Sequence, residues 1–424
     1  MIRNINIKLR GKQRSKFALT RKRKFGIFSG GVVAVIALLV AMVPLLGGTP
    51  ARAATGMAAI NVSYLYTLGG STNNAGSPTE SYWRYDDTNK YLLLYELDGN
   101  YTLTGVNPDL TVYVYNNNIN VTFDNLHLSK TAHARTLESG SHDNLTITLV
   151  GSNTATNVYA GGSVWITNNT TINGDGSLTL RATNGGGMSL MSGKNLTLSG
   201  NATLSVENDG NYSTIDANGG NTITVGAGAY LDAADNGLGY GINALSGDLH
   251  LNVNGSATFW SSSLHGIRLA DGRSLFLTGS GEISASGGGY QTAISTDQPI
   301  TMGDGGLVLG MWNDSGDPEI HTFTTASTAT HRWKLDDGAT TSDELTDATI
   351  TVEVGADNLG TITRERKAVD PGDQGGLTDP INREQPITRN PRTGDINLGL
   401  IVASTLIAGI GIILATLKLR KVQR

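Results

Sequence analysis

The chain has 424 residues, no cysteine, 55 glycines and only 6% aromatic residues, a composition that favours an all-β protein and excludes disulfides and thiolate metal sites. Its formal net charge is −5, but the part between Ala54 and Thr393 has 16 basic and 35 acidic residues, a net charge of −19. Because this segment is strongly acidic, we do not expect it to bind nucleic acid, whereas cations are plausible partners. Alternatively, the negative charge simply keeps an exported protein soluble.

Residues 1–53 have the three regions of a secretory signal peptide. A basic segment over 1–24 precedes an uncharged apolar run over 25–48, and Ala51 and Ala53 form a small-x-small cleavage site. We therefore expect export, with a mature chain that begins at Ala54. Because both the basic and the apolar region are long, a retained membrane anchor is the alternative.

Residues 54–105 are irregular, and we interpret them as an N-terminal cap. A solenoid that ended without a cap would expose unpaired strand edges and its apolar core, so terminal units are usually atypical. We expect Trp83, Tyr85, Tyr91 and Tyr95 to form the core of this cap and not a ligand site.

Residues 106–314 repeat a unit of three short strands in which apolar and polar residues alternate. Between Lys194 and Met302, apolar pairs open successive units 25–27 residues apart, and these pairs are Leu196/Leu198, Ile223/Val225, Leu249/Leu251, Leu275/Leu277 and Ile300/Met302. Third strands begin with Ile215, Ile242, Ile267 and Ile294. Alternation at a fixed period of this size is typical of a stacked solenoid. We predict a right-handed parallel β-helix with three strands per coil and a rise of about 4.8 Å per coil.

The segments after the repeats differ from them in pattern. Residues 315–366 predict three or four strands without the repeat, as a C-terminal cap or a small β-domain. Residues 367–389 are polar, rich in proline, glycine and charge, and are expected to be a disordered linker.

Residues 390–424 carry the most specific motif of the chain. The sequence Asn390-Pro391-Arg392-Thr393-Gly394 precedes 22 uncharged residues from Ile396 to Leu417 and a basic tail. A run of this length can span a bilayer, with the basic tail on the inner side. The span and tail alone would indicate a plain membrane anchor.

The pentapeptide directly before the span resembles the cell-wall sorting signal of Gram-positive surface proteins, which sortase recognises. This resemblance implies that sortase attacks the carbonyl of Thr393, releases the chain from Gly394 onward and joins Thr393 to peptidoglycan. Asn390 stands where the commonest form of the signal has leucine, so the class of sortase stays open. The chain would then be a substrate of sortase and reside in the cell wall of a Gram-positive bacterium.

Acidic residues in the repeats do not form the compact carboxylate cluster that polysaccharide-cleaving enzymes need. Asp216, Asp232, Asp235 and Asp271 are assigned to coil corners, where aspartate is favoured for turn formation alone. The segment His265–Arg268 superficially resembles part of a polygalacturonase, but the accompanying aspartate motifs are missing. We therefore expect a binding protein and not an enzyme.

Five aromatic residues are candidates for sugar binding. Alternation turns Trp165 and Trp260 outward, and Tyr212, Tyr240 and Tyr290 each precede the third strand of their coil, where they could line one edge. Exposed aromatic faces in a row suit the apolar faces of sugar rings. Alternatively, the turn tyrosines simply pack over neighbouring coils.

The repeats also resemble bacterial exported carbohydrate-binding proteins with a pectate-lyase-like β-helix, through phrases such as NLTITL, GDGSLTL, KNLTLSG and GDLHLNV within about 120–310. This resemblance implies an acidic glycan-binding surface, with calcium as the cofactor it suggests, while the residues themselves define no metal site. We expect a wall-anchored adhesin that binds extracellular polysaccharide. A polysaccharide lyase or hydrolase, and a protein-binding adhesin or structural stalk, are the alternatives.

Overall fold

The computed structural model describes residues 57–366, apart from 66–69, 75–79, 132–134, 141–143, 159–161, 304, 314–318, 326–330, 337–340, 346–347 and 355–357. The predicted signal peptide with its cleavage site, the linker and the sorting signal lie outside the described residues. Within the described part, no helix has the length and apolar character needed to cross a membrane.

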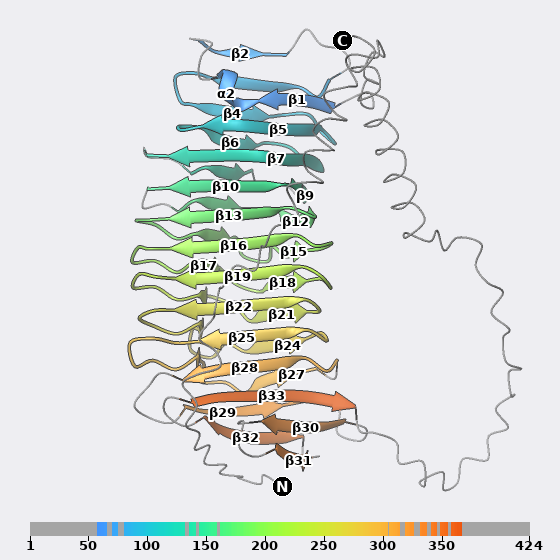
Figure 1. Cartoon of the computed structure of the whole chain (residues 1–424), viewed down its shortest axis with the longest axis vertical. Coiled ribbons are helices and arrows are strands. Elements are labelled where there is room, and N and C mark those ends of the chain that lie inside the picture. The colour runs from blue at the N-terminus through green and yellow to red at the C-terminus, as the bar shows by residue number, and fades with distance from the viewer. Residues whose placement is uncertain are drawn as a thin grey trace, which may run out of the picture. The chain divides into compact units, whose positions relative to one another are not determined.

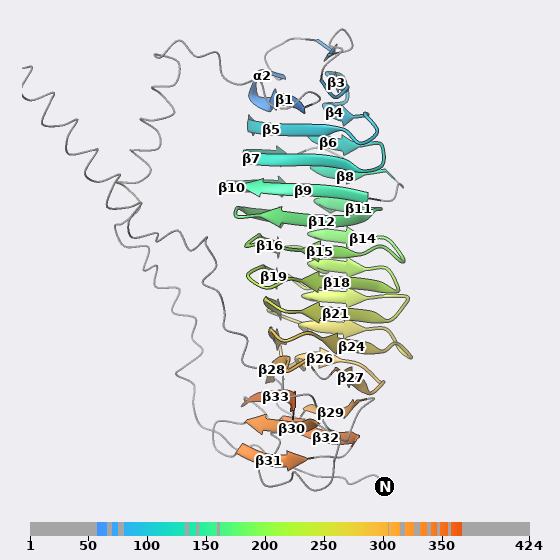
Figure 2. The ribbon, with the colours of Figure 1, turned by 90° about the vertical axis from the view of Figure 1, so that its right-hand side faces the viewer.

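The described residues form the predicted parallel β-helix, and each coil adds one strand to each of three parallel ladders (Figures 1 and 2). The first ladder consists of β1 (Met57–Asn61), β5 (Asn100–Asn107), β7 (Ile119–Lys130), β9 (Asn144–Val150), β12 (Asn169–Gly174), β15 (Leu196–Leu198), β18 (Asn221–Val225), β21 (Leu249–Val253), β24 (Leu275–Thr278), β27 (Ile300–Met302) and β29 (Glu319–Thr324).

The second ladder starts with the C-terminal parts of β5 and β7, which continue through the first corner of their coils. Its other strands are β10 (Ser152–Asn157), β13 (Ser177–Ala182), β16 (Thr203–Asn208), β19 (Tyr230–Asp235), β22 (Ser256–Ser261), β25 (Glu282–Ser286) and β28 (Val308–Asn313). The third ladder consists of β4 (Tyr91–Leu94), β6 (Thr111–Val114), β8 (Leu137–Ser139), β11 (Val164–Ile166), β14 (Met188–Leu190), β17 (Ile215–Ala217), β20 (Ile242–Ala244), β23 (Ile267–Leu269) and β26 (Ile294–Ser295).

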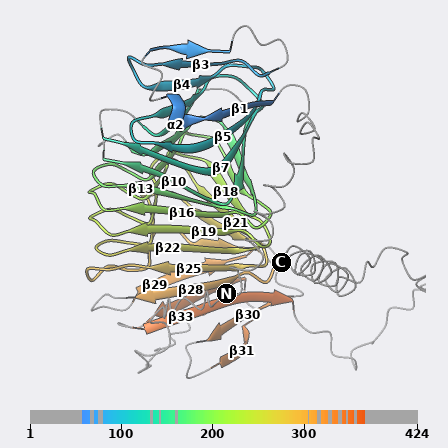
Figure 3. The ribbon, with the colours of Figure 1, turned by 45° about the horizontal axis from the view of Figure 1, so that its top comes forward.

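The core is a column of apolar side chains inside the coils. Figure 3 shows the stacked coils that surround it from an oblique view. Strand residues alternate between buried and partly exposed because successive side chains point to opposite faces. In the third ladder, Ile215, Ile242, Ile267 and Ile294 stack in register as predicted, and none is more than 1% exposed. Each coil therefore buries its inward residues against the coils before and after it.

The predicted register is correct at some coils and wrong by two residues at others. Leu196 lies opposite Ile223 as predicted, but Ile223 lies opposite Leu251 and not opposite Leu249. A shift of two residues keeps the same side chains inward, whereas a shift of one would turn each of them to the other face. Periodicity alone therefore does not distinguish these two registers.

The N-terminal segment contributes both irregular and coil strands. β2 (Thr72–Asn73) pairs antiparallel with β3 (Trp83–Asp86), which pairs antiparallel with β4, and β4 starts the parallel third ladder by pairing with β6. The short helix α2 (Val62–Leu65) buries Val62 and Leu65 against the core. Tyr85 is buried as predicted, at 1% exposure.

The C-terminal segment covers the last coil with antiparallel strands, which we call the antiparallel cap: β30 (His331–Asp336), β31 (Thr341–Leu345), β32 (Thr349–Val354) and β33 (Asn358–Arg366). β33 pairs with β28, and β32 pairs with β29, so the edges of the last parallel strands are hydrogen-bonded. Trp333 is fully buried, and the Arg364 guanidinium lies 4.7 Å from the centre of its ring.

Candidate functional site

The outer face of the third ladder presents one column of side chains along the coils. The three-residue strands there bury their first and third residues and place the middle residue on the outer face; in β20 this middle residue, Asn243, is covered as well. Hydrogen-bonded register aligns these middle residues in the order Tyr113, Glu138, Trp165, Ser189, Asp216, Asn243, Arg268 and Ser295. The column combines aromatic rings, charges and hydrogen-bonding groups at intervals of about 4.8 Å.

A cluster of tyrosines, Tyr82, Tyr95, Tyr113 and Tyr115, lies at the N-terminal end of this face; we call it the tyrosine patch. Ring centres are 5.7 Å apart for Tyr82 and Tyr95, 5.2 Å for Tyr95 and Tyr115, and 6.1 Å for Tyr113 and Tyr115. These spacings are typical of interacting aromatic rings. Tyr115 is 46% exposed, so the patch is accessible from solvent.

The patch corrects the expected role of two tyrosines. Tyr91 and Tyr95 are not in the cap core, because alternation on β4 turns Leu92 and Leu94 inward and leaves the tyrosines half-buried on the outer side. In the sequence YLLLYEL almost every residue is apolar or aromatic, so the inward phase is ambiguous. Trp83 is also half-buried and packs against the core cluster.

Trp165 lies two coils beyond Tyr113 in the outward column, as the alternation of its strand predicts. The Arg135 guanidinium lies 3.9 Å from the centre of the Trp165 ring, and Arg135 also pairs with Glu138 at 3.5 Å. A carboxylate, a guanidinium and an indole therefore meet directly beside the tyrosine patch.

Of the other four residues predicted to bind sugar, the three tyrosines lie along one edge of the solenoid and Trp260 lies elsewhere. Tyr212, Tyr240 and Tyr290 lie at the corner between the second and third ladders, where Tyr212 is 50% exposed and Tyr290 is 80% exposed. Tyr240 is half-buried and stacks on His265 with 6.0 Å between ring centres. Trp260 faces outward on the second ladder, which belongs to the other sheet, and so is not part of this edge.

The acidic residues do not all lie in corners. Asp216 is the middle residue of β17 and Asp232 lies inside β19, where outward orientation gives a charged side chain access to solvent or polar partners. Burial raises the pKa of Asp216, against the opposite effect of hydrogen bonds with Ser213 and Asn243. Asp235 ends β19 with its side chain buried, and Asp271 lies in a corner as expected.

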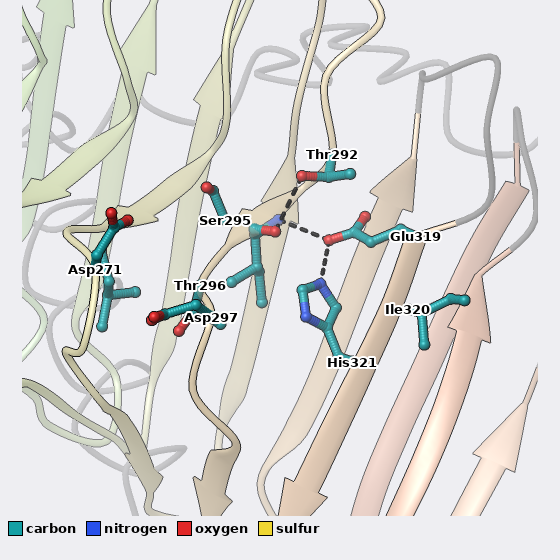
Figure 4. Close-up of a pocket in the computed structure, with 10 residues that line it drawn as sticks. Asp271, Thr292, Ser295, Thr296, Asp297, Glu319, Ile320 and His321 are labelled. Carbon is teal, nitrogen blue, oxygen red and sulfur yellow. Dashed lines mark hydrogen bonds and ion pairs between the residues drawn. The ribbon is translucent and has the colours of Figure 1, made fainter. Parts of the chain in front are cut away.

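A second candidate is an open polar hollow of about 360 Å³ at the C-terminal end of the third ladder (Figure 4). It is lined by Leu269, Asp271, Thr292, Ile294, Ser295, Thr296, Asp297, Glu319, Ile320 and His321. The two carboxylate oxygens of Glu319 each accept one backbone N–H at 2.9 Å. Oε1 accepts the N–H of Ile294, the first residue of β26, and Oε2 accepts the N–H of Ala293, the residue before it. Glu319 thus takes the place of the next strand at the end of the third ladder, and it also contacts His321 Nε2.

Metal binding finds no support in the geometry of the described residues. No three or more histidine, aspartate or glutamate side chains in this part of the chain are arranged to hold an ion. Calcium binding therefore stays an expectation that rests on the family resemblance alone.

Sequence reasoning missed Tyr82, Tyr113, Tyr115 and Arg135. The phrase TVYVY contained a usable signal, because Val112 and Val114 alternate with the two outward tyrosines. The ring contacts between coils had no such signal, since they depend on register. In comparisons with known proteins, no family model matches the chain, and neither a curated protein nor a solved structure matches it.

Proposed function

We propose that this is a non-catalytic surface protein that binds extracellular polysaccharide on the outer face of the third ladder. The observation that supports this function best is the tyrosine patch, whose rings contact one another across two coils and continue towards Trp165. Partly exposed rings in contact form an apolar surface against which the C–H faces of sugar rings can pack, although neighbouring rings are tilted by 31–50° to one another. Glu138 and Arg135 supply a hydrogen-bond acceptor and donor for the hydroxyl edges of the same sugars.

The next coil places a glycine beside Tyr115. Ser139 pairs with Val114, which places Gly140 next to Tyr115, and the Gly140 N–H donates to the Val114 carbonyl at 2.7 Å. Because glycine has no side chain, this neighbouring position does not cover the tyrosine ring. A sugar chain that runs along the coils could therefore contact Tyr115 and reach Trp165 without displacing a side chain at Gly140.

Glycan-array binding of the protein, with and without calcium, tests this function. Contact between two aromatic rings is worth about 0.5–1.5 kcal/mol beyond area burial. With a similar value for a sugar ring on Tyr115, Tyr115→Ala should weaken binding about twofold to tenfold. Tyr115→Phe retains the ring and should bind nearly as well as the natural protein. Tyr230→Ala, which removes a tyrosine from the second ladder, is the matched control on another face.

Three outcomes would contradict the proposal in different ways. Binding to no glycan in either condition would remove the carbohydrate function and favour the protein-binding adhesin, which pull-downs with host proteins would detect. Equal binding by the Tyr115→Ala and Tyr230→Ala variants would remove the tyrosine patch as the site. Release of reducing ends or unsaturated products from a bound polysaccharide would favour the lyase or hydrolase.

We also propose that the protein is exported and linked to peptidoglycan through Thr393, on the order of motif, apolar span and basic tail in the sequence. Thr393→Ala should move the protein from the covalently bound wall fraction to the membrane or the medium. Fractionation of wall digests measures this change. An unchanged wall fraction would mean that sortase does not act at Thr393.

A further inference from the structure

Beyond Trp165, the outer face of the third ladder carries short side chains until it reaches Tyr240. Ser189 and Asp216 follow Trp165 in register on the next two coils. Tyr240 stands two residues before β20 in the coil after Asp216, and its ring stacks on His265 with 6.0 Å between ring centres. The rise from the coil of Trp165 to that of Tyr240 is about 14 Å, at about 4.8 Å per coil. Two aromatic side chains therefore bracket a stretch of short side chains on the face already proposed for sugar binding.

The carboxylate of Asp216 lies in the middle of this stretch and can accept further hydrogen bonds. Asp216 is half-buried, and its side chain is hydrogen-bonded to those of Ser213 and Asn243. A Cβ on Gly186, in the preceding coil, would lie 3.6 Å from Asp216 Oδ2 and 4.0 Å from the Cβ of Tyr212. Because glycine has no side chain, this position does not cover Oδ2. A carboxylate has about four lone-pair sites, so the bonds to Ser213 and Asn243 leave acceptor capacity for a ligand.

The charges around this stretch favour an uncharged ligand. Glu138 and Asp216 are the acidic members of the outward column, and residues 54–393 have a net charge of −19, so an acidic polymer would be repelled. The two arginines nearest to the stretch already have partners. Arg135 pairs with Glu138 at 3.5 Å, and Arg268 Nη1 donates to a neighbouring asparagine amide at 2.9 Å. The hydroxyl groups of a neutral sugar can donate to the carboxylate instead, and hydrogen bonds to an ionised acceptor are stronger than those between neutral groups.

We propose that Asp216 accepts hydrogen bonds from the hydroxyl groups of an uncharged, extended polysaccharide that lies along the third ladder between Trp165 and Tyr240. The proposal rests on the carbohydrate function proposed above, and it adds the class of polymer and the residue that selects it. Neighbouring hydroxyl groups of one sugar ring match the two oxygens of a carboxylate, while the aromatic rings at both ends pack against C–H faces. An extended glycan advances per sugar by a length close to the rise of one coil, so successive sugars meet successive coils.

Affinity electrophoresis of the full chain tests the class of polymer and the role of Asp216. Each gel would contain one neutral polysaccharide (hydroxyethyl cellulose, laminarin, mannan or arabinoxylan) or one acidic polysaccharide (polygalacturonate or alginate). At least one neutral polymer should retard the protein, and neither acidic polymer should. Asp216→Asn should raise the apparent Kd for that neutral polymer about fivefold to tenfold, because a neutral amide replaces an ionised acceptor. Asp232→Asn, on the outer side of β19 in the second ladder, is the matched control and should behave like the natural protein.

A second variant, Ser189→Leu, keeps the carboxylate of Asp216 but places a larger apolar side chain between it and Trp165, so it should also weaken retardation. Melting temperatures like that of the natural protein would show that both variants are folded. Retardation by acidic polymers alone, by no polymer, or equally in the Asp216→Asn and Asp232→Asn variants would refute this proposal. The carbohydrate function itself would fail only if the glycan array also showed no binding, so the two failures are distinguishable.

Discussion

Asp235 should make the stability of the solenoid depend on pH. Its side chain is fully buried; Oδ1 accepts the N–H groups of Gly237 and Gly239 at 3.0 Å each, and Oδ2 accepts Asn208 Nδ2 at 2.9 Å. Burial raises the pKa of Asp235 from 3.8 to about 6, and the hydrogen bonds offset only part of this effect. The folded state therefore binds the proton more tightly than the unfolded state does.

The sign and size of the effect follow from this difference in pKa. The contribution of Asp235 to the free energy of unfolding is largest below pH 3.8 and is lost as the pH rises through about 6. A pKa difference of about two units between the folded and the unfolded state corresponds to about 3 kcal/mol of free energy of unfolding. About 2 kcal/mol of this should be lost between pH 4.5 and pH 7. Asp235→Asn cannot ionise, so the variant should lack this contribution.

Urea unfolding followed by tryptophan fluorescence at pH 4.5 and pH 7 measures the effect. The difference in free energy of unfolding between Asp235→Asn and the natural protein should change by about 2 kcal/mol between the two pH values, in favour of the variant at pH 7. Other titrating groups cancel in this difference. Exposed Asp98→Asn, which should show no such change, serves as the control. A difference that is the same at both pH values would refute the reasoning.

Two further predictions concern the packing between coils. Phe259 is fully buried, so Phe259→Ala should lower the free energy of unfolding by about 3–5 kcal/mol in urea titrations; a loss below 1 kcal/mol would mean that neighbouring coils collapse into the cavity. A Cβ on Gly239 would lie 2.0 Å from the Tyr212 carbonyl of the preceding coil, whereas a Cβ on Gly70 would meet nothing within 4 Å. Gly239→Ala should therefore lower the melting temperature by several degrees and Gly70→Ala should not, and equal melting temperatures would contradict the close approach of the coils.

The ladders could be predicted from the sequence because their signal is local. An inward isoleucine recurs at the same place in the last four strands of the third ladder, beginning with Ile215 and Ile242, so the pattern predicts both the face and the stacking there. At Ile223 and Leu251 the same pattern fits two registers, and the turn lengths that decide between them carry no apolar signal.

The sites could be predicted only in part. Trp165 was found because its apolar neighbours fix its orientation, whereas the patch around Tyr95 and Tyr115 needed the register of β4 on β6. The hollow could not be predicted, since Glu319 and His321 belong to β29 in the first ladder and no local pattern indicates that Glu319 binds the end of the third ladder. Contacts between coils depend on the conformation of the turns. The residue types in a turn limit the conformations that it can adopt but do not select a single one.

The antiparallel cap also determines where the stack of coils stops. A parallel strand at the end of the solenoid would offer the same hydrogen-bonding edge that each coil offers to the next, and a second molecule could continue it. β32 and β33 occupy this edge with strands of reversed direction, so the repeating pattern cannot be extended there by another coil. A chain shortened before β29 would expose an unpaired strand edge at that end, to which a second molecule could add its own strands. We expect such a chain to polymerise into linear assemblies and not simply to unfold.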